Sequence, residues 1–142
     1  MVDVDLLADK LRDLDERIAR VRARRTSTVE ALAVDRDAFE IVAFNLMLAV
    51  QCCVDISLHV IADARWPVPR NAADAFDVLA AHGMLSGTTA ASLRAAVGFR
   101  NVVAHGYAGV DPHKVHAAAT TGLHDLTEFA RQLAASVAPS RT

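Results

Sequence analysis

The fold is decided by residues 39–61, which read FEIVAFNLMLAVQCCVDISLHVI. Apolar side chains occupy most positions of this stretch, so a helix formed by it would be apolar nearly all the way round. Such a helix lies at the centre of a bundle or is shared with a partner. We therefore predict a long helix over roughly residues 35–63, with the other helices packed around it.

The sequence before this stretch predicts one helix over roughly residues 3–25. Its apolar side chains recur at steps of three and four, which places them in one stripe. They are Leu7, Leu11, Leu14, Ile18 and Val21. The Thr26-Ser27-Thr28 segment then interrupts the pattern.

The sequence after this stretch predicts three more helices. Two prolines within residues 65–69 stop the central helix, and Asn71 is a suitable N-cap for a short helix that ends near Gly83. A fourth helix is expected over roughly residues 88–104. Asp111-Pro112 begins a fifth, whose apolar stripe runs without a break to residue 137. The predicted fold class is all-α, an up-and-down bundle of four or five helices in a single domain over residues 1–137, with a disordered tail over residues 138–142.

Composition limits the classes of function. The 142 residues are 53% hydrophobic and carry a net charge of −2, so the chain lacks the overall basic field of a general nucleic-acid binder. The adjacent Cys52 and Cys53 point about 100° apart on a helix, which favours free thiols in a reducing compartment. The acidic start has no signal-peptide pattern, and no run of about 18 uninterrupted apolar residues occurs. We expect a cytoplasmic protein without a membrane span.

One segment combines an arginine, an amide, a histidine and the only tyrosine of the chain: Arg100-Asn101-Val102-Val103-Ala104-His105-Gly106-Tyr107. Arginine is a fixed cation that forks onto phosphate, and histidine exchanges protons near neutral pH. Asn101 and His105 share a helix face, whereas Arg100 and His105 are about 140° apart at roughly 100° per residue. The latter two converge through the long arginine stem or through fraying near Gly106. The combination favours phosphate chemistry over acyl transfer.

The central helix carries a narrow polar stripe formed by Gln51, Asp55 and His59, spaced by four. One interpretation is a hydrogen-bonded core network that sets the register of the helices. The other is that Asp55 supports the arginine or histidine of the segment just described. The residues alone leave both open.

Other features have plainer interpretations. The five arginines at the end of the first helix form either a solvated face or an electropositive rim for RNA phosphates; they are Arg17, Arg20, Arg22, Arg24 and Arg25. His113 and His116 share a face, but no recognised metal motif accompanies them, so we predict no metal site and no cofactor. Gly98 costs about 1 kcal/mol relative to alanine inside a helix, and we expect close approach of another helix to offset this cost.

The pattern Arg100-x4-His105-x-Tyr107 resembles the signature of the HEPN superfamily, specifically the HepT-like toxins of the DUF86 group. The downstream Val110-Asp111-Pro112 and the helix that carries Gln51, Asp55 and His59 are also similar to that family. The resemblance covers roughly residues 4–135. It implies a metal-independent endoribonuclease, the toxin of a type VII toxin–antitoxin system.

By position, the resemblance makes Arg100 and His105 the catalytic pair, with Asn101 orienting the phosphate or the imidazole. One histidine per chain is short of an acid-and-base pair, and the homodimer that the family implies would supply two. The implied partner is a minimal nucleotidyltransferase antitoxin that transfers AMP from ATP to Tyr107. Gly106 departs from the larger or acidic residues common at its position in the family. The alternative is a non-catalytic helical partner or scaffold subunit of a nucleotidyltransferase.

Overall fold

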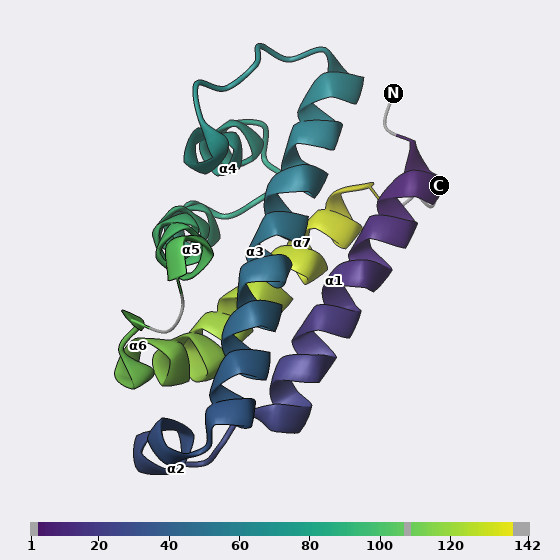
Figure 1. The fold of residues 1–142 in the computed structure, drawn as a ribbon. Coiled ribbons are helices and arrows are strands. Elements are labelled where there is room, and N and C mark those ends of the chain that lie inside the picture. The colour runs from purple at the N-terminus through teal and green to yellow at the C-terminus, as the bar shows by residue number, and fades with distance from the viewer. Residues whose placement is uncertain (1–2, 107–108, 138–142) are drawn as a thin grey trace.

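The computed structural model describes residues 3–106 and 109–137, which are helical with short connections (Figure 1). In chain order the elements are α1 (Val4–Arg24), α2 (Val29–Val34), α3 (Arg36–Ala64), α4 (Ala72–Ala81), α5 (Gly87–Gly106), α6 (Pro112–Ala117), a π-helical turn (Ala118–Gly122) and α7 (Leu123–Val137). No strand occurs in these two ranges. The prediction of an all-α bundle is confirmed. Tyr107 and the predicted tail lie outside the described residues.

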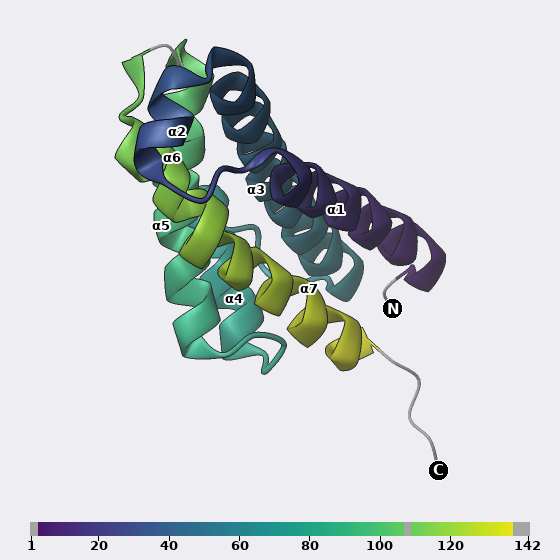
Figure 2. The same ribbon diagram turned by 90° about the horizontal axis from the view of Figure 1, so that it is seen from below.

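The central position predicted for the apolar stretch is confirmed, because α3 contacts every other helix of the bundle (Figures 1 and 2). α1 runs along one side of α3, and α4 and α5 cover another side, while α6 and α7 cross behind. The core joins all of these layers. Within it, the rings of Phe76 in α4 and Phe129 in α7 meet edge to face, with centroids 5.9 Å apart.

By length and composition alone, α3 could cross a membrane. Its most apolar window is, however, 56% buried against the other helices. Apolarity of this kind is also what the core helix of a water-exposed bundle requires. The surroundings of α3 therefore account for its composition without a bilayer.

Five helices begin with a side chain that accepts a first-turn N–H, and the starts of four of them were predicted closely. The caps are Asp3, Thr28, Asp35, Asn71 and Asp111. The sequence analysis missed only the helix capped by Thr28, the six-residue α2. Thr28 is a recognisable N-cap residue, but six residues are too few to show a helical period of apolar side chains.

One expectation was wrong, and a second is not met within the described chain. The last helix is not a continuous α-helix, since the π-helical turn separates α6 from α7. Gly98 has no close neighbour among the described residues: a Cβ placed there would meet nothing within 4 Å, and the residue is exposed. Whatever offsets its helix cost lies outside the described intramolecular contacts.

Candidate active site

Arg100 is held where α5 crosses α3, by hydrogen bonds to two neutral amides. Its Nη1 donates to Gln51 Oε1 at 2.9 Å, and its Nη2 and Nε donate to Asn101 Oδ1 at 2.7 and 3.2 Å. Gln51 in turn donates from Nε2 to Asp55 Oδ1 at 2.8 Å. A neutral oxygen orients a guanidinium without cancelling its charge. The partly buried Arg100 therefore presents an uncompensated, positioned cation.

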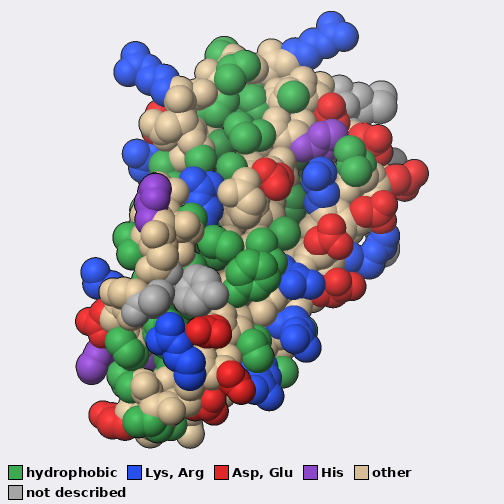
Figure 3. Space-filling view, viewed as in Figure 1, with side chains coloured by type: hydrophobic (Ala, Val, Ile, Leu, Met, Phe, Trp, Pro, Cys, Tyr) green, Lys and Arg blue, Asp and Glu red, His purple; other side chains and the backbone are tan. Residues whose placement is uncertain are grey.

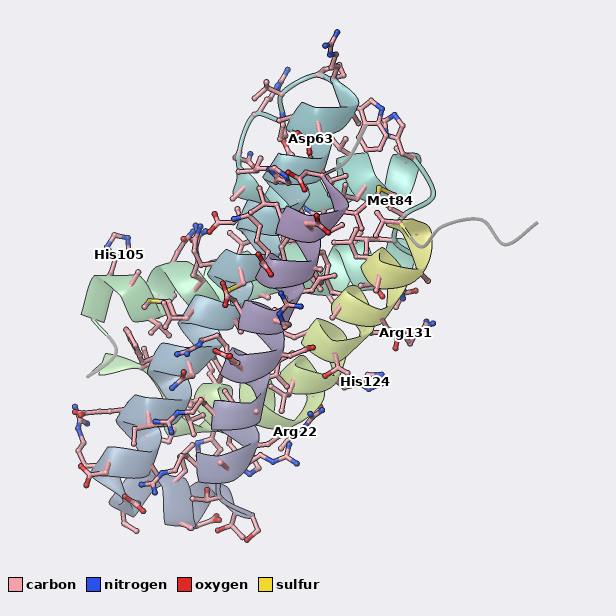
Figure 4. The ribbon with its side chains drawn as sticks, turned by 90° about the vertical axis from the view of Figure 1, so that its right-hand side faces the viewer. Arg22, Asp63, Met84, His105, His124 and Arg131 are labelled. Carbon is pink, nitrogen blue, oxygen red and sulfur yellow. The ribbon has the colours of Figure 1, made fainter. Side chains whose placement is uncertain are left out.

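His105 lies in the last turn of α5 and is exposed (Figure 4). The helix continues through Gly106, so fraying before His105 does not bring it toward Arg100. Asn101 and His105 are neighbours on one helix face, and Asn101 Oδ1 accepts from the Arg100 guanidinium, so this contact turns the arginine side chain toward the face that carries His105.

The predicted polar stripe of α3 divides into two parts. Gln51 and Asp55 join the Arg100 network, whereas His59 Nε2 lies 3.1 Å from Asp63 Oδ2. Gln51 and His59 are only partly buried and Asp55 is exposed, so a core network is the wrong interpretation of this stripe. The structure brings two of the three side chains to the arginine and leaves His59 with a different partner.

Exposed apolar side chains surround this network. Phe44 and Leu58 lie seven residues to either side of Gln51 on the same face of α3, and they are 46% and 38% exposed. Val102 of α5 is 53% exposed. Figure 3 shows hydrophobic side chains gathered over this part of the molecule. The Arg100 network therefore lies within an apolar surface of the kind that associates with another chain.

The two cysteines and the possible metal-binding side chains of the described residues do not form a second centre. The pKa values of the Cys52 and Cys53 thiols are raised, mainly by burial, and for Cys52 also by the nearby carboxylates of Asp13 and Asp55. Both thiols are free, as predicted. A raised pKa leaves them protonated and weakly nucleophilic near neutral pH. Within residues 3–106 and 109–137, no cluster of three or more His, Cys, Asp or Glu side chains could hold a metal ion.

The described residues form an all-helical bundle, with an arginine and a histidine five residues apart near the end of one helix. The chain belongs to the HepT-like family: the model of the ribonuclease HepT-like family matches residues 14–133. The family prediction is confirmed. Among curated proteins, the mRNA nuclease HepT of Shewanella oneidensis is 29% identical over 66 residues, which is 46% of this chain and 50% of the relative. The chain thus spans about half the length of that relative.

Solved structures show the same fold. One is a toxin–antitoxin complex with AMP-PNP, at a TM-score of 0.85, 21% identity, and 92% and 98% coverage of this chain and that chain. A second is the tri-AMPylated Shewanella oneidensis HEPN toxin in complex with the MNT antitoxin. Its TM-score is 0.83 at 22% identity, with 95% of this chain and 99% of that chain covered. A third is the cytosolic protein YutE of Bacillus subtilis. Its TM-score is 0.81 at 13% identity, with 99% of this chain and 96% of that chain covered. At these identities the likeness establishes the fold.

Proposed function

We propose that this protein is a cytoplasmic, metal-independent endoribonuclease toxin of a type VII toxin–antitoxin system. The observation that carries the proposal is the Arg100 guanidinium, oriented by Gln51 and Asn101 on the same helix as the exposed His105, five residues further on. Membership of the ribonuclease HepT-like family and the resemblance to mRNA nuclease HepT support the same activity.

In the proposed reaction, a ribose 2′-oxygen attacks the adjacent phosphorus and the 5′-oxygen of the next nucleotide leaves. His105 accepts the 2′-hydroxyl proton or donates a proton to the leaving oxygen. Arg100 stabilises the additional negative charge of the phosphorane-like transition state. Because its anchors are neutral, its full positive charge is available to that transition state. The products are a 2′,3′-cyclic phosphate and a 5′-hydroxyl.

The reaction needs an acid and a base, and each chain supplies one histidine at this place. A homodimer formed through the apolar surface of α3 and α5 would bring two copies of the motif to one groove. Phe44, Leu58 and Val102 border the Arg100 network and supply the apolar contact area for this association. Gly98 lies exposed on α5 as well and would permit a close approach of the partner helix.

The proposed partner is a minimal nucleotidyltransferase antitoxin. The Tyr107 oxygen would attack the α-phosphorus of ATP, pyrophosphate would leave, and the phenolic proton would pass to solvent. The attached AMP places negative charge and bulk two residues from His105, which obstructs an incoming RNA phosphate. The similar solved structure described as a tri-AMPylated HEPN toxin in complex with MNT antitoxin supports this assignment.

The test is cleavage of RNA by purified protein, with and without EDTA. The wild type should cleave equally in both conditions and leave cyclic phosphate ends. His105→Ala should lose about 10²–10⁴-fold in rate. His124→Ala, which changes another exposed histidine on α7, is the matched control and should cleave as the wild type does.

Three outcomes would contradict the proposal. Cleavage that survives in His105→Ala would remove the catalytic assignment. Cleavage that EDTA abolishes would remove the metal-independent mechanism. A tight complex with the nucleotidyltransferase but no harm to RNA would establish the scaffold alternative instead.

A further inference from the structure

The arginines fall into groups according to what holds them. Some are paired with carboxylates: Arg12 with Asp9, Arg36 with Glu40, Arg94 with Asp74 and Asp77, and Arg131 with Glu128. Others donate to neutral oxygens, as Arg100 does. These are Arg17, Arg22 and Arg25, all from the arginine cluster at the end of α1. A guanidinium in this second group is oriented but keeps its net charge and most of its five donors.

Arg22 and Arg25 line one hollow. Arg22 Nη2 donates to Thr127 Oγ1 of α7 at 3.3 Å, and Arg25 Nη1 donates to the carbonyl of Ala119 in the π-helical turn at 3.0 Å. The hollow has a volume of about 630 Å³, and Thr26, Ser27 and Thr120 complete its lining. Among the described residues, the lining contains no carboxylate, and neither arginine forms an ion pair.

The hollow offers donors to an anion. Ser27 is exposed, and no hydrogen bond of its hydroxyl occurs within the described ranges. In the same ranges, the backbone N–H groups of Thr26 and Ser27 donate to no backbone carbonyl. Two anchored guanidinium groups line the hollow, and the hydroxyl and N–H groups of its lining residues are further donors of the kind that bind phosphate oxygens.

We propose that this hollow binds a backbone phosphate of the RNA substrate, at a position remote from the bond that is cleaved. The inference rests on the proposed ribonuclease function. Figure 4 shows Arg22 and His105 at well-separated places on the molecule, so one phosphate cannot reach both. The phosphate in the hollow therefore belongs to a different nucleotide of the strand.

The lining favours a phosphodiester over a free nucleotide. It contains no aromatic ring and no apolar side chain larger than a threonine methyl group, so a nucleobase would find no stacking surface there. A backbone phosphate needs only charge and hydrogen-bond donors. The arginine cluster thus forms part of the surface along which the RNA strand binds. This is the electropositive rim that the sequence pattern offered as one interpretation.

The experiment measures binding apart from cleavage. All variants carry His105→Ala, so that binding is measured without cleavage. The test variant combines Arg22→Gln with Arg25→Gln. The control variant combines Arg12→Gln with Arg131→Gln, which removes an equal number of charges from positions paired with carboxylates. A fluorescent single-stranded RNA is titrated at several salt concentrations. The first double variant should bind roughly tenfold more weakly and lower the slope of log K against log salt by about 0.7, the value for one lost phosphate contact on a single strand. The control should change little.

Cleavage kinetics provide the second measurement, in proteins that retain His105. Replacing Arg22 and Arg25 should raise KM for a long RNA, leave kcat unchanged and leave cleavage of a dinucleotide unaffected. A structural defect would also lower dinucleotide cleavage, so that result overturns the inference. Equal losses in both double variants overturn it too, as does competition by AMP at the affinity of the RNA, which would identify a nucleotide site. If the wild type fails to cleave but binds RNA through these arginines, the ribonuclease proposal falls and this site remains.

Discussion

The support that Gln51 gives to Arg100 can be tested by Gln51→Leu, which keeps the side-chain size and removes the oxygen 2.9 Å from Arg100 Nη1. A hydrogen bond to a charged group contributes about 1.5–3 kcal/mol. Both side chains are partly exposed, so water recovers some of this contribution, and we take about 1–2 kcal/mol. At about 1.4 kcal/mol per factor of ten, the rate of RNA cleavage should fall roughly 5–30-fold.

The assay is single-turnover cleavage of a defined RNA over a range of enzyme concentrations. If Gln51 positions the guanidinium for the transition state, the loss should occur mainly in the maximal rate rather than in the concentration dependence. Asp55→Asn keeps an oxygen acceptor for Gln51 Nε2 and should cost less than Gln51→Leu. His59→Gln changes the third residue of the same stripe, which lies beside Asp63, and should leave cleavage unchanged.

Two results would refute this reasoning. If Gln51→Leu cleaves at the wild-type rate, the hydrogen bond does not position Arg100. If His59→Gln lowers the cleavage rate as much as Gln51→Leu does, the effect comes from α3 as a whole rather than from the hydrogen bond between Gln51 and Arg100. Thermal unfolding of each variant should show that the folded population is the same.

Three further predictions concern stability and assembly. Phe129→Ala removes a fully buried ring that packs on Phe76 and should lower the free energy of unfolding by about 3–5 kcal/mol, measured in urea, whereas Val34→Ala at an exposed position should have little effect. Hydrogen bonds from Arg131 and Gln132 lower the pKa of Glu128 from 4.5 to about 2. The stabilisation by these bonds is therefore present above pH 4.5 and is lost as the pH falls through 2. The difference in Tm between the wild type and Glu128→Gln should shrink across that pH range, and a difference that stays constant would contradict the assignment. Phe44→Glu with Leu58→Glu should convert the proposed dimer to a monomer in sedimentation analysis, while Val34→Glu and Val68→Glu, which alter exposed apolar residues elsewhere, should not.

Local signals account for what was predicted well. Side-chain caps at Asp35, Asn71 and Asp111 define helix starts because a cap and the N–H it accepts from lie within three residues of each other. The π-helical turn was not predictable in the same way. Its Ala119 carbonyl accepts a hydrogen bond from Arg25, a residue 94 positions earlier, and no local pattern reports such a contact.

The sequence by itself determined the helical class, the central position of α3 and the family, because apolar period, caps and the Arg100-x4-His105-x-Tyr107 pattern are all local. It also placed Asn101 and His105 on one helix face. Only the tertiary structure decided that Gln51 contacts Arg100 while His59 lies beside Asp63, and that Arg22 and Arg25 share a hollow without a carboxylate. The reason is that the direction of a long polar side chain depends on which helix lies against it, and that is set by packing between segments far apart in the chain.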